Sequence, residues 1–233
     1  MKSSLVLTII NDNEPGQGLM NEWGLSIHAK LPIGMEVIFD FDTEPSVLKF
    51  NMEKLGIDPG NIRIGVLSHR HMDHSGGLSY IAMVNNRIEL YVTADSLSQV
   101  RDYGFELIKV NRDGLRISES LYLTPPLPAY GLLEQALLIY PQEKHPVLLV
   151  GCSHPGVDKL AEAATRIIGE KLYLVIGGFH MPSRGTLDNL TRLTRFVSPI
   201  HCSGEQAKNY VRKVYSEKYI PARTGSTLEI PFE

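Results

Sequence analysis

Alternating apolar and polar positions predict strands at the start of the chain. Residues 5–10 form one such run, and residues 25–31 and 37–39 form two more that flank a turn at Gly34. The first run ends at Asn11-Asp12-Asn13, which is typical of a loop. His28 falls on the polar side of the second run, so we expect a solvated side chain there.

Strand-like and helix-like patterns then alternate along most of the chain, which predicts the α/β class. Pro45 begins the first helical pattern, and Gly56 ends it. The patterns that follow it predict strands over 62–67, 88–92, 105–110, 135–140, 146–150, 172–176 and 197–200, helices over 78–84, 97–103, 157–168, 187–197 and 207–214, and a closing strand pair over 219–230.

Residues 125–130 contain three prolines with apolar and aromatic neighbours, which predicts a stiff segment. Two interpretations of this segment stay open. It is either a wall or lid over a site, or a rigid connection.

A cluster of metal-ligand residues follows the strand at 62–67. His69, His71, Asp73 and His74 place three imidazoles and one carboxylate within six positions, followed by Gly76-Gly77. Neutral imidazole and carboxylate are the ligands that zinc, manganese and iron favour. A turn alone does not explain this density of ligand types, so we predict a metal-binding loop.

Three further histidines, His154, His180 and His201, each lie just beyond an apolar strand. In an α/β sheet, the loops at the strand ends meet at one rim, so these side chains are expected to share a metal centre with the loop. The set offers more ligands than one tetrahedral ion needs. Two metal ions are therefore expected.

Composition limits the classes of function. The 233 residues, 43% of them apolar, suffice for one sizeable core. A net charge of −3 without blocks of like charge argues against a nucleic-acid surface, and no apolar run approaches membrane-spanning length. With only two cysteines, the chain has no disulfide framework, and we expect a cytoplasmic protein. The oligomeric state, including a homo-oligomer, stays open.

The loop and its surroundings resemble the metallo-β-lactamase superfamily. The matching features are His-x-His-x-Asp-His after an apolar strand and Asp40 at the end of an earlier strand. The resemblance implies a single domain over residues 1–233, folded as an αββα four-layer sandwich.

A narrower resemblance is to the branch of 7,8-dihydropterin-6-methyl-4-(β-D-ribofuranosyl)aminobenzene-5′-phosphate synthase-like hydrolases. The matching segments, in chain order, are Asn11-Asp12-Asn13, Glu22-Trp23-Gly24-Leu25-Ser26, Leu67-Ser68-His69, Asp73-His74-Ser75-Gly76-Gly77-Leu78, Gly151-Cys152-Ser153-His154-Pro155-Gly156, Gly177-Gly178-Phe179-His180 and His201-Cys202-Ser203-Gly204. Since such branches diversify in substrate, the resemblance implies the metal site more strongly than the named reaction.

The resemblance also implies a ligand set. The first metal would be bound by His69, His71 and His154, and the second by Asp73 and His74, with His180 and His201 completing or bordering it. Two zinc ions are expected, with manganese or iron as alternatives.

The chain departs from the superfamily pattern at one point, because no Gly-Asp follows the later strands to supply a bridging aspartate. His180, the Cys152 thiolate or a solvent bridge could fill that role. Asp40 is expected to orient a ligand histidine through its second ring nitrogen. Asp42 and Thr43 could instead cap the helix that begins at Pro45.

The expected function is a metal-dependent hydrolase in which Asp73 holds the nucleophile. The substrate would be a phosphorylated small molecule or an acyl compound. Trp23 would either stack on a flat heterocycle or lie in the core. A di-iron redox protein and a non-catalytic binding protein are the alternatives. Residues expected to line the pocket are Glu22, Trp23, Ser203 and Lys208, together with the segment 125–130.

Overall fold

The computed structural model describes residues 4–141 and 144–231, and these form two compact units. The first unit contains the described residues up to Val110 together with those from Arg223 onward, and the second unit is Asn111–Ala222. The expectation of a single domain over residues 1–233 stays a prediction.

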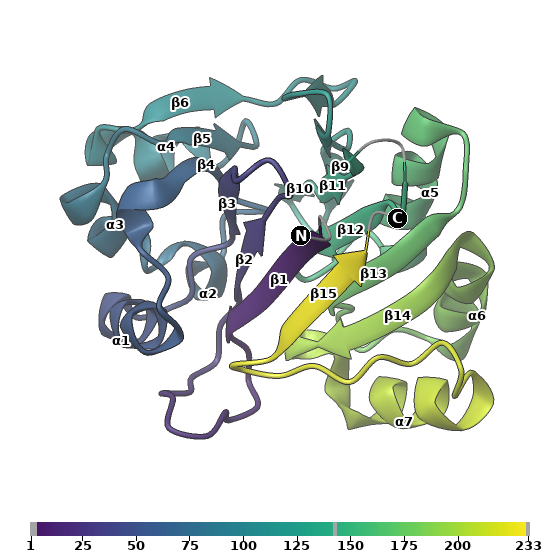
Figure 1. Ribbon diagram of the computed structural model, residues 1–233. Coiled ribbons are helices and arrows are strands. Elements are labelled where there is room, and N and C mark those ends of the chain that lie inside the picture. Colours follow the sequence, from purple (N-terminus) through teal and green to yellow (C-terminus); the bar gives the residue numbers. More distant parts are fainter. Residues whose placement is uncertain (1–3, 142–143, 232–233) are drawn as a thin grey trace. The chain divides into compact units, whose positions relative to one another are not determined.

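A mixed sheet forms the centre of the first unit (Figure 1). Among the described residues its seven strands have the order β15-β1-β2-β3-β4-β5-β6. The strands β15 to β3 pair antiparallel, whereas β3 to β6 pair parallel. The strand bounds are β1 (Ser4–Asn11), β2 (Ser26–Lys30), β3 (Glu36–Phe39), β4 (Ile62–Val66), β5 (Glu89–Val92), β6 (Glu106–Lys109) and β15 (Thr227–Pro231).

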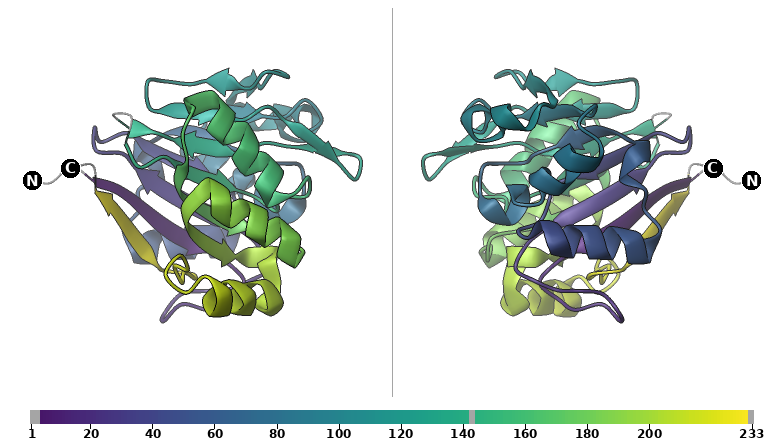
Figure 2. Two further views of the ribbon diagram at one scale, coloured as in Figure 1. Left: turned by 90° about the vertical axis from the view of Figure 1, so that its right-hand side faces the viewer. Right: turned by 90° about the vertical axis from the view of Figure 1, so that its left-hand side faces the viewer.

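Helices cover one face of this sheet, and Figure 2 (right) shows them in front of it. They are α1 (Pro45–Leu55), α2 (Met72–Ser75), α3 (Leu78–Val84) and α4 (Leu97–Val100), with the 3₁₀ turns η1 (Pro59–Asn61) and η2 (Arg101–Tyr103). The apolar face of α1, with Leu48 and Met52, packs in one buried cluster with Ile38, Leu78 and Leu90. As predicted, Pro45 begins α1, and Gly56 ends it in a left-handed conformation.

The second unit contains a six-stranded sheet within its described residues, in the order β14-β13-β12-β11-β8-β7. The strands β12, β13 and β14 are parallel, and β7, β8, β11 and β12 pair antiparallel. A separate hairpin joins β9 and β10. The bounds are β7 (Leu115–Arg116), β8 (Leu121–Leu123), β9 (Leu127–Ala129), β10 (Leu132–Glu134), β11 (Leu137–Ile139), β12 (Val147–Val150), β13 (Leu172–Gly178) and β14 (Thr194–Ile200).

Three helices cover one face of the second sheet (Figure 2, left). They are α5 (Val157–Ile168), α6 (Arg184–Leu193) and α7 (Gly204–Val214), and α7 follows the 3₁₀ turn η4 (His201–Ser203). Leu160, Leu187 and Val211, one from each helix, share a buried cluster with Val175 and Val197 of the sheet. No helix in the part of the chain that the structure describes is long and apolar enough to cross a membrane.

Some expected elements differ in the structure. The closing strand pair over 219–230 is wrong. Tyr219 makes an isolated bridge to Val197, Pro221 has no N–H to donate, and β15 pairs with β1 instead. Residues 127–129, within the segment predicted to be stiff, form strand β9. The solvated His28 is also wrong, because this side chain is buried beside Glu36, with Nε2 3.1 Å from Oε2. Burial lowers the pKa of His28.

Candidate metal centre

In the first unit, the metal-ligand residues begin where β4 ends. Asp40, directly after β3, is fully buried and has a positive φ of 58°. Its carboxylate accepts hydrogen bonds from the Ser68 N–H at 2.7 Å and from the Ser68 hydroxyl at 2.8 Å. Burial raises the pKa of Asp40, whereas the neighbouring His74 opposes that shift. This carboxylate therefore ties the end of β3 to the start of the histidine loop.

The same loop orients two histidine rings through Nδ1. In His74, Nδ1 lies 2.6 Å from Asp40 Oδ2, and in His69, Nδ1 lies 2.8 Å from Ser68 Oγ. Both rings are buried, with their centroids 4.3 Å apart. A partner at Nδ1 fixes the tautomer and makes Nε2 the ligand atom, as in many metal sites. The two rings therefore fit a metal.

His71 and Asp73 extend this group. His71 Nδ1 lies 3.1 Å from His69 Nε2. Two nitrogens bound to one tetrahedral zinc ion, each at 2.0–2.1 Å, lie about 3.3 Å apart, so this separation fits a shared ion. Asp73 Oδ2 accepts a hydrogen bond from Trp23 Nε1 at 2.9 Å and lies 3.6 Å from His74 Nε2. Four predicted ligands of the first unit are thus brought together.

Two glycines allow this loop to pack against the chain after β3. A Cβ on Gly76 would lie 1.8 Å from the Thr43 carbonyl oxygen, and one on Gly77 would lie 2.1 Å from the Phe41 carbonyl oxygen. The Gly77 N–H donates to that same Phe41 oxygen. Any larger residue would push α2 away from Asp40.

In the second unit, the predicted ligands follow the ends of the three parallel strands β12, β13 and β14. Parallel strands end at one edge of a sheet, and the chain turns sharply there. Ser153, His180 and His201 all have positive φ angles of 50–62°. A Cβ on residue 178 would lie 2.4 Å from the Gly151 carbonyl oxygen, so glycine is the residue that fits there.

A buried carboxylate that the sequence analysis missed orients His154. Glu134, the last residue of β10, accepts from the backbone N–H groups of Ser153 at 2.6 Å and His154 at 2.7 Å, and its Oε2 lies 2.9 Å from His154 Nδ1. His154 thus has the same Nδ1 anchoring as His69 and His74. The sequence signal for this role was an acidic residue, Glu134, directly after the apolar pair Leu132-Leu133.

His154 lies close to a second histidine and a thiol. Ligand atoms of Cys152, His154 and His180 lie within 4.8 Å of one another, and the two rings are 4.5 Å apart. At the tip of the β9–β10 hairpin, the ring of Tyr130 is 6.4 Å from both histidines. The end of the segment 125–130 thus lies beside two predicted ligands, which favours a wall. The rigid connection stays the alternative.

The two cysteines belong to the same region of the second unit. Cys152 Sγ lies 3.5 Å from His201 Nε2, and Cys202 Sγ lies 3.7 Å from the Cys152 carbonyl oxygen. Hydrogen bonding to Cys152 and His180 lowers the pKa of Cys202 to about 4, and the bond to Cys202 raises the pKa of His180. Thiolate with imidazole is a donor set that suits zinc or iron.

The structure also places the remaining predicted pocket residues. Trp23 is 60% exposed, so the alternative of a core tryptophan is wrong. Glu22 Oε1 accepts from the Glu44 N–H at 2.6 Å. In the second unit, Lys208 is buried with Nζ 3.6 Å from Glu205 Oε1, and the Ser203 hydroxyl accepts from the Phe179 N–H at 3.0 Å. Their roles toward a substrate stay predictions.

The capping alternative for Asp42 and Thr43 is wrong. The residue before α1 is Glu44, and its side chain makes no capping hydrogen bond. Asp42 Oδ1 accepts instead from Asn11 Nδ2 at 2.8 Å and from the Thr43 N–H at 3.0 Å.

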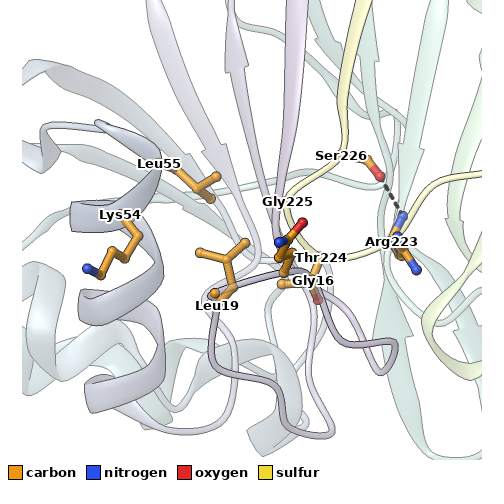
Figure 3. Close-up of a pocket in the computed structure, with 10 residues that line it drawn as sticks. Gly16, Leu19, Lys54, Leu55, Arg223, Thr224, Gly225 and Ser226 are labelled. Atoms are coloured by element: carbon orange, nitrogen blue, oxygen red, sulfur yellow. Dashed lines mark hydrogen bonds between the residues drawn. The ribbon is translucent and has the colours of Figure 1, made fainter.

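The first unit also has a pocket of about 580 Å³, shown in Figure 3, that none of the predicted ligands lines. Its walls come from the loop around Leu19, the end of α1 and the turn around Gly225. Lys54 and Arg223 lie on opposite sides of it (Figure 3). Its two cationic side chains do not converge.

Comparison with solved structures shows that the chain has the metallo-β-lactamase fold, as the sequence predicted. A metal-dependent hydrolase of the β-lactamase superfamily superposes with a TM-score of 0.82 at 22% identity, covering 97% of this chain and 99% of that one. A diphosphatase of the PhnP family superposes with a TM-score of 0.66 at 14% identity, covering 100% of both chains.

Among curated proteins, a distant homologue is the 7,8-dihydropterin-6-methyl-4-(β-D-ribofuranosyl)-aminobenzene-5′-phosphate synthase of Methanocaldococcus jannaschii. It is 25% identical over 250 aligned positions, which cover 84% of this chain and 85% of the relative. No protein-family model matches the chain.

Proposed function

We propose that the protein is a metal-dependent hydrolase that acts on a phosphoester. The observation that carries the proposal is the shared anchoring of His69, His74 and His154, each of which has Nδ1 within 2.9 Å of a side-chain oxygen. That arrangement makes Nε2 the ligand atom in all three histidines. The same arrangement occurs in both units, and metal binding explains why it is repeated. The fold supports the same activity, as does the name of a structural neighbour with a TM-score of 0.82, a metal-dependent hydrolase.

The proposed ligands are His69, His71, Asp73 and His74 from the first unit and His154, His180 and His201 from the second. Cys152 is proposed as an additional ligand or as the orienting partner of His201. A bound divalent ion, most simply zinc at two positions, would supply an activated water at neutral pH and screen developing negative charge. That the two groups of residues serve one two-metal centre stays a prediction.

The chain's own residues would orient the reaction. Asp73 would accept a proton from the attacking water, and the Trp23 N–H that bonds to it at 2.9 Å would hold its carboxylate in place. Asp40 and Glu134 would keep His74 and His154 in the ligating tautomer. The exposed Trp23 ring would contact the substrate. A phosphoester is favoured because the homologue is named as a phosphate synthase and a structural neighbour as a diphosphatase.

The test combines metal analysis with a panel of substrates. The purified protein should contain divalent metal and hydrolyse a phosphodiester such as bis(p-nitrophenyl) phosphate, or the monoester p-nitrophenyl phosphate, faster than a lactone. His71→Ala should abolish that activity and lower the metal content while the circular dichroism spectrum stays unchanged.

His145→Ala is the matched control, since it removes an imidazole that packs on Tyr173 instead of lying in either ligand group. It should leave metal content and activity unchanged. Metal-free protein without hydrolysis would refute the proposal, and a redox-active iron pair without hydrolysis would favour the di-iron alternative.

A further inference from the structure

A groove on the second unit has the shape and charge of a ligand site. It lies between α6 and α7, which pack side by side (Figures 1 and 2), and has a volume of about 610 Å³. Leu187 and Ala207, both buried, give it an apolar floor. Small-molecule sites have volumes of roughly 300–1,000 Å³ and combine an apolar lining with a few polar groups.

The charged side chains that line this groove are both basic. Arg184 begins α6, and Lys213 lies near the end of α7. Among the described residues of its lining, none is acidic. The nearby carboxylate of Asp188 accepts hydrogen bonds from the hydroxyls of Tyr210 at 2.8 Å and Tyr215 at 2.7 Å, which lower the pKa of Asp188. Two phenols thus share that negative charge.

The groove also offers a fixed aromatic ring and amide donors. The Tyr210 ring is held at its hydroxyl by Asp188, and the Arg184 guanidinium lies 5.4 Å from the ring centroid. Gln206 and Asn209 of α7 add side-chain amides to the lining. A guanidinium, an ammonium and amide N–H groups in the lining of one groove are donors that can bind a phosphate group, and an aromatic ring in the same lining can contact a planar part of the molecule.

The pocket of Figure 3 is a useful contrast. It has a similar volume and also two basic residues, but Lys54 and Arg223 lie on its opposite sides and no aromatic residue lines it among those described. The α6–α7 groove differs because Arg184 is packed onto Tyr210 within it.

We propose that the groove between α6 and α7 binds a small molecule that carries a phosphomonoester group, with Arg184 and Lys213 binding the phosphate. A smaller pocket of about 240 Å³ shares Pro182, Gln206 and Ala207 with the groove and is also lined by Met181, which directly follows His180. A ligand in the groove therefore lies next to the loop that carries a predicted metal ligand. The site does not depend on the proposed hydrolysis.

The experiment measures the affinity of the full-length protein for adenosine 5′-monophosphate by calorimetry, with adenosine and inorganic phosphate as comparison ligands. The variant Arg184→Ala/Lys213→Ala removes both cations from the groove. The matched control, Arg166→Ala/Lys171→Ala, removes the same charges from exposed positions outside its lining. All four side chains are exposed, so both variants should fold, which circular dichroism checks.

The monophosphate should bind the wild type and the control variant with equal affinity, and the groove variant at least about tenfold more weakly, since two charge-assisted contacts are lost. Inorganic phosphate should lose affinity in the same variant, and adenosine should bind all three proteins weakly and alike. Equal affinity of the groove and control variants for the monophosphate would overturn the proposal, as would wild-type protein that binds no monophosphate. Because binding is read directly, a failure of the hydrolase proposal leaves this result interpretable.

Discussion

At the scale of single residues, the candidate centre is defined by the partners of its histidines. Ser68, Asp40 and Glu134 each hold an Nδ1 atom, and each comes from a different segment of the chain. A histidine in a solvated loop has no need of such a partner, whereas a metal ligand gains a fixed tautomer and a more basic Nε2. The anchoring oxygens are therefore as informative as the imidazoles themselves.

The contact of Asp40 with His74 Nδ1 predicts the effect of Asp40→Asn. Asp40 uses one carboxylate oxygen for the Ser68 N–H and the other for His74 Nδ1. Asparagine has only one acceptor oxygen, so it cannot serve both donors, and the His74 ring loses its fixed tautomer when the amide nitrogen faces it. We expect a metal affinity roughly 10–100-fold lower, measured by competition with a chromogenic chelator.

The control for this experiment is Asp102→Asn, which makes the same chemical change at an exposed surface position. Its metal affinity should match the wild type. Unchanged affinity in Asp40→Asn would mean that His74 does not bind metal through Nε2.

At the scale of elements, the sequence pattern located most of the strands and the predicted ligands that follow their ends. His154, His180 and His201 could be placed because apolar runs of strand length end one to four positions before them. Glu134 was missed, because its partner His154 comes 20 positions later and the pairing depends on how β10 packs. Periodicity reports the face of a residue but not its partner.

The glycine pair after the histidine loop shows how an element depends on backbone approach. Gly76→Ala should destabilise the protein by about 3 kcal/mol or more, because its Cβ would overlap the Thr43 carbonyl oxygen at 1.8 Å and neither backbone segment can yield easily. Urea unfolding followed by circular dichroism measures this.

Gly185→Ala is the matched substitution in the first turn of α6. The nearest atom to its Cβ would be Ser183 Oγ at 3.7 Å, so we expect it to be neutral or stabilising by about 0.5–1 kcal/mol. If Gly76→Ala were as stable as Gly185→Ala, the close packing of α2 on the segment after β3 would be wrong.

At the scale of the whole molecule, the sequence predicted the α/β class and the fold but misplaced the end of the chain. β15 pairs with β1 across more than two hundred positions, and the buried Thr224 hydroxyl accepts from the Asp12 N–H at 3.0 Å. The local pattern predicted a strand pair around Thr224-Gly225. In the structure, β15 instead forms its backbone hydrogen bonds with β1, the first strand of the chain. Such long-range choices follow from packing, which single-sequence periodicity does not contain.

Stability as a function of pH is a whole-molecule property that one buried carboxyl should control. Burial, together with the negative charge of Glu22, raises the pKa of Asp42 from 3.8 to about 8 in the folded state. Between these values the folded protein holds a proton that the unfolded chain has released, so stability falls as pH rises from about 4 to 8. Asp42→Asn removes this titration. Asparagine keeps an oxygen for the Asn11 and Thr43 donors and tolerates the positive φ of 63°.

Thermal unfolding of both proteins at pH 5 and at pH 8.5 tests this. The melting temperature of Asp42→Asn, measured relative to wild type, should rise by roughly 4 °C or more between the two pH values. The gain should grow with pH because the wild type alone must bury an extra charge at the higher value. Asp102→Asn, at an exposed position, should follow the wild type at both. A constant difference between Asp42→Asn and wild type would show that Asp42 is already ionised in the folded protein at pH 5, and that Asn11 and Thr43 compensate its charge despite burial.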